Sequence, residues 1–216
     1  LPINKEKIIK KINKNFTGHT ELLQKLDKKK YSNMIFYSKK IIILSLTTHI
    51  SIKSISNLLN KKKYIYKKIK LLVETLKIDF QINNPKIVIS GLNPHAGENG
   101  EISNEEILYI KPAIKKLINK GVSIDGPFSA DSLFSKINLK KYDCFVCNYH
   151  DQALIPFKII SGFKGINYTG SLDIIRISPD HGTAYDLVGK NKGNFESVLN
   201  CFKLINTLIK NRSKIA

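Results

Sequence analysis

Apolar residues along this chain form two kinds of pattern. Continuous apolar runs of strand length occupy residues 33–38, 40–49, 86–90 and 143–150. Apolar residues at helical spacing mark residues 21–30, 51–79 with a break near 60–63, 104–121 and 194–211. Because strands and helices alternate, the chain is predicted to fold as an α/β domain with helices on the faces of a sheet. The first two strands are predicted to pair as a hairpin.

Length and composition allow one sizeable α/β domain or two small ones. The chain has 216 residues, of which 42% are hydrophobic and 25% are charged. Its longest apolar run, at 41–46, is too short to cross a membrane, and the charged N-terminus has no signal-peptide pattern. We therefore expect a cytoplasmic protein without a membrane partner.

The net charge of +19 raises the alternative of a nucleic-acid-binding protein. Arginine, the side chain best suited to phosphate and base contacts, occurs only at positions 176 and 212. The remaining positive charge is lysine spread among Asn and Ile, and runs such as 28–30 and 61–63 are expected to be solvated. We therefore expect no nucleic-acid partner.

The three cysteines are too few for a disulfide framework. Cys144 and Cys147 form a C-x-x-C spacing, but both lie in the apolar run 143–150. Side chains three residues apart in a strand point to opposite faces, whereas a redox or zinc pair needs a turn or a helix N-terminus. The two cysteines are therefore predicted to be buried structural residues.

Three of the five histidines, His49, His95 and His150, end or follow predicted strands. Ligands of α/β sheets bind at the carboxyl ends of strands, so these imidazoles are predicted to meet on one divalent ion that keeps open positions. Glu98 and Asp151 stand near two of them and are expected to orient the rings or to bind the ion through water.

Two loops contain glycine beside chemically active side chains. The segment GLNPHAGENG at 91–100 surrounds His95 with glycines, which allow a sharp turn after the strand. This loop is therefore predicted to present His95 to the ion. The segment SPDHGTAYDLVGK at 178–190 is expected either to approach a nucleotide or to form only a tight turn.

The remaining polar residues suit an anionic ligand. His19 and Thr20 stand before a predicted helix, whose N-terminus favours a phosphate or a carboxylate, and a simple helix cap explains them equally well. Lys158, Asn167 and Arg176 lie in otherwise apolar, strand-like segments. A charge there is costly unless it is paired, so an anionic ligand is a reasonable partner.

These segments, in their order along the chain, resemble the motifs of the 4-hydroxythreonine-4-phosphate dehydrogenase family. They read PINKE, FTGHTE, TTHI, GLNPHAGE, FSADS, YHDQ, GINYTG and SPDHGTAYDLVGK, and they span essentially the whole chain. The last motif also resembles the HG-x-A-x-D-x-x-GK stretch of the isocitrate and isopropylmalate dehydrogenases, whose fold the family shares.

The resemblance implies an α/β/α sandwich of the isocitrate and isopropylmalate dehydrogenase type, with a cleft between two subdomains. The family region covers 1–216, and residues 20–170 are expected to form the metal, substrate and dimerisation subdomain. Residues 1–19 and 171–216 are expected to belong to the cofactor-side subdomain. Family members carry the first part of that subdomain before PINKE, so we expect a chain truncated at its N-terminus.

The resemblance also assigns roles to individual residues. The expected ligands of a divalent metal ion (zinc, magnesium or cobalt), contributed by both subunits of a homodimer, are His49, His95 and His150. The expected substrate-binding residues are His19, Thr20, Lys158, Asn167 and Arg176. Residues expected near the metal are Asp131, Asp151 and Glu98. Those expected on the NAD or NADP side are His181, Gly182 and Thr183.

The implied activity is the NAD-dependent, metal-dependent oxidation and decarboxylation of 4-phosphohydroxy-L-threonine to 3-amino-2-oxopropyl phosphate in pyridoxal phosphate biosynthesis. The substrate is thus a small phosphorylated hydroxy-amino acid. Two alternatives stay open. One is a dehydrogenase of a related four-carbon sugar-acid phosphate, and the other is a truncated chain without catalytic activity.

Overall fold

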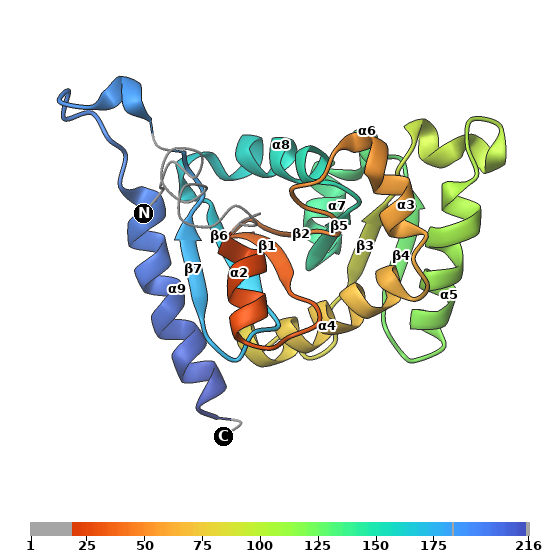
Figure 1. The fold of residues 1–216 in the computed structure, drawn as a ribbon, viewed down its shortest axis with the longest axis horizontal. Coiled ribbons are helices and arrows are strands. Elements are labelled where there is room, and N and C mark those ends of the chain that lie inside the picture. Colours follow the sequence, from red (N-terminus) through yellow and green to blue (C-terminus); the bar gives the residue numbers. More distant parts are fainter. Residues whose placement is uncertain (1–18, 183, 215–216) are drawn as a thin grey trace.

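The computed structural model describes residues 19–182 and 184–214 (Figure 1). Within these residues the centre of the fold is a seven-stranded sheet with the order β4-β3-β5-β2-β1-β6-β7. The strands are β1 (Asn33–Ser38), β2 (Ile41–Ser45), β3 (Ile87–Ser90), β4 (Ile124–Phe128), β5 (Cys144–Cys147), β6 (Ile166–Gly170) and β7 (Arg176–Pro179). Strands β4, β3, β5 and β2 are parallel, whereas β1, β6 and β7 each run antiparallel to the preceding neighbour in the sheet.

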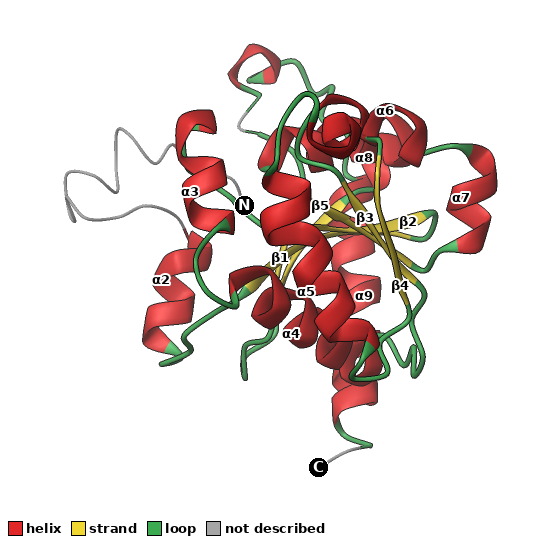
Figure 2. Cartoon of the chain, turned by 90° about the vertical axis from the view of Figure 1, so that its right-hand side faces the viewer, coloured by secondary structure: helices red, strands yellow, loops and turns green. Residues whose placement is uncertain are grey.

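Helices cover both faces of the sheet (Figures 1 and 2). One face packs on α4 (Tyr64–Asp79), α5 (Lys111–Ile118) and α9 (Glu196–Arg212). The other packs on α6 (Ala130–Leu133), α7 (Lys136–Lys141) and α8 (His150–Ser161). The remaining helical segments are α2 (His19–Leu26), η2 (Ile52–Ser54), α3 (Ile55–Leu59), η3 (Pro94–Gly100), η4 (Glu106–Ile110), η5 (Gly162–Lys164) and η6 (Tyr185–Leu187).

The central strands are buried on both faces. In β2, Leu44 belongs to the hydrophobic cluster on the α4 side, and Ile43 to the cluster on the α8 side. In β5, Val146 and Phe145 alternate in the same way. Burial on two sides explains why these strands appear in the sequence as continuous apolar runs and not as an apolar–polar alternation.

Most predicted elements agree with the structure in order and type. The strand predicted at 33–38 is β1, and it pairs with β2 as the expected antiparallel hairpin. The helical pattern over 51–79 breaks between α3 and α4, where Lys63 has a φ of +66°. The fold is therefore the predicted α/β arrangement of one sheet flanked by helices.

Two local predictions were wrong. His150 does not end a strand, because β5 ends at Cys147 and His150 is the first residue of α8. Lys158 lies on the same helix and not in a strand-like segment. The reason is a buried helical stripe in which Ala153 and Phe157, four residues apart, both face the sheet and are fully buried.

The structure confirms the prediction for the C-x-x-C pair. Cys144 and Cys147 are free and fully buried in β5. Burial raises the pKa of both thiols, so neither is a ready thiolate. Among the helices of the described residues, none is long and apolar enough to cross a membrane.

Candidate functional site

The candidate site lies at one edge of the parallel part of the sheet. Strands β3, β5 and β2 are neighbours in that order. At their carboxyl ends the chain continues into the segments that carry His95, His150 and His49, respectively. The three histidines therefore stand at the edge where the sequence predicted them, and their role in metal binding stays a prediction.

His49 and His150 lie close together, with ring centroids 6.0 Å apart. Nδ1 of His150 lies 2.7 Å from Oδ1 of Asp151, and Nδ1 of His49 lies 3.5 Å from Oε1 of Glu21. The hydrogen bond with His49 is the main cause that lowers the pKa of Glu21 to about 2. Each ring thus has a carboxylate at Nδ1, which leaves Nε2 for another partner. Metal-binding histidines commonly show this arrangement.

His95 stands apart from this pair. It is an exposed residue of η3, on the loop after β3. The Asp131 carboxylate has a lowered pKa, mainly because of the Ser129 hydroxyl and the Ser132 backbone N–H, and His95 makes a further contribution. Glu98 lies on the same loop and is exposed.

The predicted meeting of three imidazoles is not found within one chain. Among the residues that the structure describes, no group of three His, Cys, Asp or Glu side chains is placed to hold a metal ion. The physical reason lies in the loop after β3, whose turn keeps His95 in solvent beside Asp131. A shared site between two chains is a separate prediction, which this observation does not contradict.

Hydrogen bonds between neighbouring strand ends hold the histidine edge together. The backbone N–H and the hydroxyl of Thr47 both donate to the Asn148 carbonyl, at 3.2 and 2.8 Å. The Asn148 side chain, fully buried, donates to the Ser90 carbonyl at 2.9 Å. These bonds join the ends of β2, β5 and β3, so the segments bearing the three histidines start from fixed positions.

Sequence reasoning missed three residues of this region. Glu21 received no role beyond its place in a helical first turn, and Glu106 and Gln152 received none. Glu106 is 1% exposed and accepts hydrogen bonds from the loop that carries His95, and Gln152 bridges two strand ends. The only signal was position, since Gln152 stands in YHDQ two residues after His150 and Glu106 follows the glycine-rich segment.

Asn167 and Arg176 come together on β6 and β7. Nη1 of Arg176 donates to Oδ1 of Asn167 at 3.3 Å and to Oγ1 of Thr169 at 3.2 Å. Burial lowers the pKa of Arg176, and the nearby Glu21 carboxylate opposes that change. Because both hydrogen-bond acceptors are neutral, the guanidinium charge suits an anionic group of a ligand.

Lys158 has a carboxylate partner within the chain, so its charge is paired without a ligand, and its role in substrate binding stays a prediction. Its ammonium group lies 3.0 Å from Oδ1 of Asp180 and donates to the Asp180 carbonyl at 2.7 Å. Burial raises the pKa of Asp180, and Lys158 acts in the opposite direction. The other predicted substrate residue within the described part, Thr20, is buried in the first turn of α2.

Lys158 also borders a cavity of about 650 Å³ on the side of the loop 178–190. His181 and Gly182 line this cavity together with apolar residues such as Leu187 and Val188. Its volume is in the range of small-molecule sites. Thr183 and the His19 side chain lie outside the described residues.

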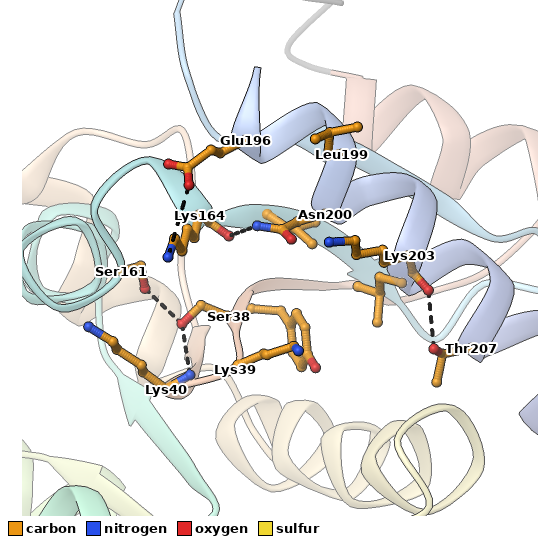
Figure 3. A pocket seen from close by; sticks show the side chains of 13 residues that line it. Ser38, Lys39, Lys40, Ser161, Lys164, Glu196, Leu199, Asn200, Lys203 and Thr207 are labelled. Carbon is orange, nitrogen blue, oxygen red and sulfur yellow. Dashed lines mark hydrogen bonds and ion pairs between the residues drawn. The ribbon is translucent and has the colours of Figure 1, made fainter. Parts of the chain in front are cut away.

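A second cavity, of about 480 Å³, lies at the opposite edge of the sheet, beside the turn between β1 and β2 (Figure 3). Its lysines are Lys39, Lys40, Lys164 and Lys203. Lys164 lies 3.9 Å from the Glu196 carboxylate. None of the predicted site residues lines this cavity, so it is separate from the histidine edge.

Comparison with known proteins identifies the family. The model of the family described as pyridoxal phosphate biosynthetic protein PdxA matches residues 1–205. The chain belongs to this family. The resemblance seen in the motifs is thereby confirmed.

Individual members of the family and related structures agree with this result. The chain is 43% identical over 209 residues to 4-hydroxythreonine-4-phosphate dehydrogenase of Aquifex aeolicus (strain VF5), which covers 97% of the chain. The crystal structure of that dehydrogenase from Klebsiella pneumoniae covers 98% of the chain, at 34% identity and a TM-score of 0.80. A terephthalate 1,2-cis-dihydrodiol dehydrogenase from Burkholderia xenovorans LB400 covers 88% of the chain, at 25% identity and a TM-score of 0.71.

The chain matches less than two thirds of the length of these relatives. It spans 64% of the Aquifex protein and 62% of the Klebsiella chain.

Proposed function

We propose that the chain acts in the NAD-dependent, divalent-metal-dependent oxidation and decarboxylation of 4-phosphohydroxy-L-threonine to 3-amino-2-oxopropyl phosphate in pyridoxal phosphate biosynthesis. The observation that carries the proposal is the pair His49 and His150, each with a carboxylate at Nδ1, at the carboxyl edge of parallel strands. Membership of the PdxA family and the names of the relatives support the same reaction.

His49, His95 and His150 would hold the divalent ion, and the cavity beside His181 and Gly182 would receive the nicotinamide cofactor, NAD or NADP. The donor chemistry fits, because neutral imidazoles oriented by carboxylates suit zinc, cobalt and related ions. A bound metal ion would supply Lewis acidity for the hydroxyl group that is oxidised, and a bound nicotinamide would supply a hydride acceptor.

The residues of the chain would bind and orient the substrate. Arg176, with Asn167 beside it, presents donors for the phosphate or the carboxylate, and His19 and Thr20 would contribute from the start of α2. Lys158 would exchange its contact with Asp180 for one with the substrate. Oxidation of the hydroxyl yields a β-keto acid, which loses CO₂ to give the amino ketone phosphate.

The acidic residues would act around the metal. Asp151 orients His150 through its contact with Nδ1, and Glu21 does the same for His49. Asp131 and Glu98 stand beside the segment that carries His95. We further propose that residues 20–170 form the metal and substrate subdomain, with 171–216 on the cofactor side.

A homodimer would complete the metal site. We infer this because His49 and His150 lie together in one chain whereas His95 stands apart, with no three-ligand group among the described residues. His95 of a second copy would then join His49 and His150 of the first. A symmetric dimer would contain two such sites.

The activity is tested with the purified chain, NAD⁺ and 4-phosphohydroxy-L-threonine, following NADH by its absorbance. We expect turnover that is lost on chelation of divalent metal and on substitution His95→Ala. The matched control is His181→Ala, which removes an imidazole from the cofactor cavity and is expected to raise the KM for NAD⁺ while metal binding is kept. Metal binding without turnover would reject the proposed activity and favour a non-catalytic chain.

The shared site is tested by mixing two inactive variants, His95→Ala and His150→Ala. If each site takes its ligands from both subunits, half of the random dimers contain one intact site, and about a quarter of the activity returns. If all ligands come from one subunit, the mixture stays inactive.

The second candidate is a dehydrogenase of a related substrate, such as a four-carbon sugar-acid phosphate. It is favoured by the similar fold of a dehydrogenase whose name gives a different substrate. Initial rates with a panel of phosphorylated hydroxy acids, with and without the amino group, distinguish the two. A higher kcat/KM for a substrate without the amino group would support this second candidate.

A further inference from the structure

The loop after β3 contains a left-handed turn. Residues 95–99 are consecutive, and all have positive φ, between 41° and 78°. Gly97 accommodates this conformation and Asn99 tolerates it, but the side chains of His95, Ala96 and Glu98 disfavour it. A strained turn of this kind persists only where its surroundings hold it in place. The contacts at its base must therefore stabilise it.

Glu106 holds the base of the turn from one side. Its Oε1 accepts hydrogen bonds from the backbone N–H groups of Leu92 and Asn93, both at 2.8 Å, and its Oε2 accepts one from the Asn93 side chain at 3.1 Å. The carboxylate is packed so closely that a Cβ at Gly97 would lie 2.6 Å from Oε2. The Glu106 carboxylate therefore satisfies the N–H groups at the base of the turn and leaves no room for a side chain at position 97.

Gln152 holds the same base from the other side. Its Nε2 donates to the Gly91 carbonyl at 2.8 Å. Its Oε1 accepts from the Asn148 backbone N–H and from the Ser90 hydroxyl, both at 2.8 Å. One carboxamide thus joins the end of β3 and the end of β5 to the first turn of α8, two residues after His150.

We propose that Gln152 and Glu106 are positioning residues that together clamp the peptide groups of residues 91–93 and thereby hold the left-handed turn that presents His95. Gln152 also stands on the helix that begins with His150. The clamp therefore links the segment of His95 to the helix of His150 in the same chain, and in the proposed dimer these two ligands serve different metal sites. This inference rests on the proposed function, in which His95 binds a divalent ion.

The clamp is tested with variants that keep the shape of the side chain. Gln152→Glu keeps the Oε1 acceptor and replaces the Nε2 donor by an oxygen that faces the Gly91 carbonyl. Gln81→Glu is the matched control, because Gln81 is exposed two residues after the end of α4 and its Nε2 donates to the Ile78 carbonyl. Both changes add the same negative charge. The readout is the dissociation constant for Co²⁺, measured from its visible absorption.

We expect Gln152→Glu to weaken Co²⁺ binding by about 10- to 100-fold, the range seen when partners of metal ligands are removed, and Gln81→Glu to leave it unchanged. A double-mutant cycle with His95→Ala separates positioning from general stability. If the clamp acts through His95, Gln152→Glu has no further effect once His95 is replaced.

Two results overturn the inference. One is unchanged Co²⁺ affinity in Gln152→Glu, and the other is an equal loss of affinity with and without His95. If His95→Ala itself leaves Co²⁺ affinity unchanged, the proposed metal site is rejected. The clamp is then tested separately by amide hydrogen exchange. In the unaltered protein, the amides of Leu92 and Asn93 are expected to be protected, and exchange at the rate of an open loop would exclude the clamp.

The milder variant Ser90→Ala serves if Gln152→Glu does not fold. It removes the hydroxyl that donates to Oε1 of Gln152 at 2.8 Å, together with two longer contacts of 3.4 Å to the Val146 carbonyl and from the Asn148 side chain. We expect a loss of Co²⁺ affinity that again disappears in the His95→Ala background, and a loss that persists there would count against the clamp.

Discussion

Lys68 is a charged residue in the hydrophobic core, and its replacement should stabilise the protein. It lies on α4, is 5% exposed, and donates a hydrogen bond to the Ser32 carbonyl. Burial lowers the pKa of the ammonium group from 10.5 to about 7, against the opposing effect of Glu21. Lys68→Met removes the charge and keeps the length of the side chain.

The size of the effect follows from the change in pKa. A fall from 10.5 to about 7 corresponds to a cost of about 5 kcal/mol for a protonated Lys68, as an upper value. The substitution also leaves the buried Ser32 carbonyl without its donor, which costs about 1–3 kcal/mol. At pH 6.5 we therefore expect Lys68→Met to raise the free energy of unfolding by about 2 kcal/mol.

The sign reverses at high pH. Between pH 7 and 10.5 the unfolded chain binds the proton and the folded chain does not, so the unaltered protein gains stability as the pH rises. Above this window the charge no longer contributes a cost, and only the lost hydrogen bond of Ser32 distinguishes the variant. At pH 10.5 Lys68→Met should therefore be the less stable protein.

Urea denaturation followed by circular dichroism at pH 6.5 and pH 10.5 measures both free energies. The control is Lys70→Met on the same helix, whose exposed ammonium group lies 3.7 Å from Glu74. It should change stability by less than about 1 kcal/mol at pH 6.5. The reasoning is refuted if Lys68→Met is destabilising at pH 6.5, or if its effect is the same at both pH values.

Three further predictions concern other parts of the fold. Nε of the partly buried Arg212 lies 2.6 Å from Oδ1 of Asp79. Asp79→Ala removes this carboxylate and should lower the free energy of unfolding, measured by urea denaturation, by about 3–5 kcal/mol. A loss below 1 kcal/mol would contradict a structural role for this pair. Arg176→Ala should raise the KM for 4-phosphohydroxy-L-threonine by about tenfold or more in initial-rate assays, because a charge-assisted contact with the substrate is lost. An unchanged KM would exclude that contact. Because Cys144 and Cys147 are fully buried, they should react with Ellman's reagent in urea but not in the folded protein. Rapid reaction without urea would show that the β5 thiols are accessible.

Local patterns were sufficient for most elements and for their order, but not for α8, whose residues were read as strand-like. Continuous apolar runs identified β1, β2, β3 and β5, because strands buried on both faces contain few polar residues. The same reasoning located the histidines, because parallel strands place their carboxyl ends at one edge of the sheet. The motif order was sufficient for the family, since each motif is short but the ordered set covers the chain.

Contacts between distant segments decided the rest. The burial of Lys68 depends on its packing against the start of β1, and the pairing of Lys158 with Asp180 joins residues 22 positions apart. The left-handed turn around His95 depends on Glu106 and on Gln152, which comes 61 residues after Gly91. The conformational propensity of a single residue contributes less to its final conformation than such tertiary contacts do. The strand edge that carries the histidines was therefore readable from the sequence, whereas the side chains that hold His95 there became visible only once β3, β5 and α8 were packed together.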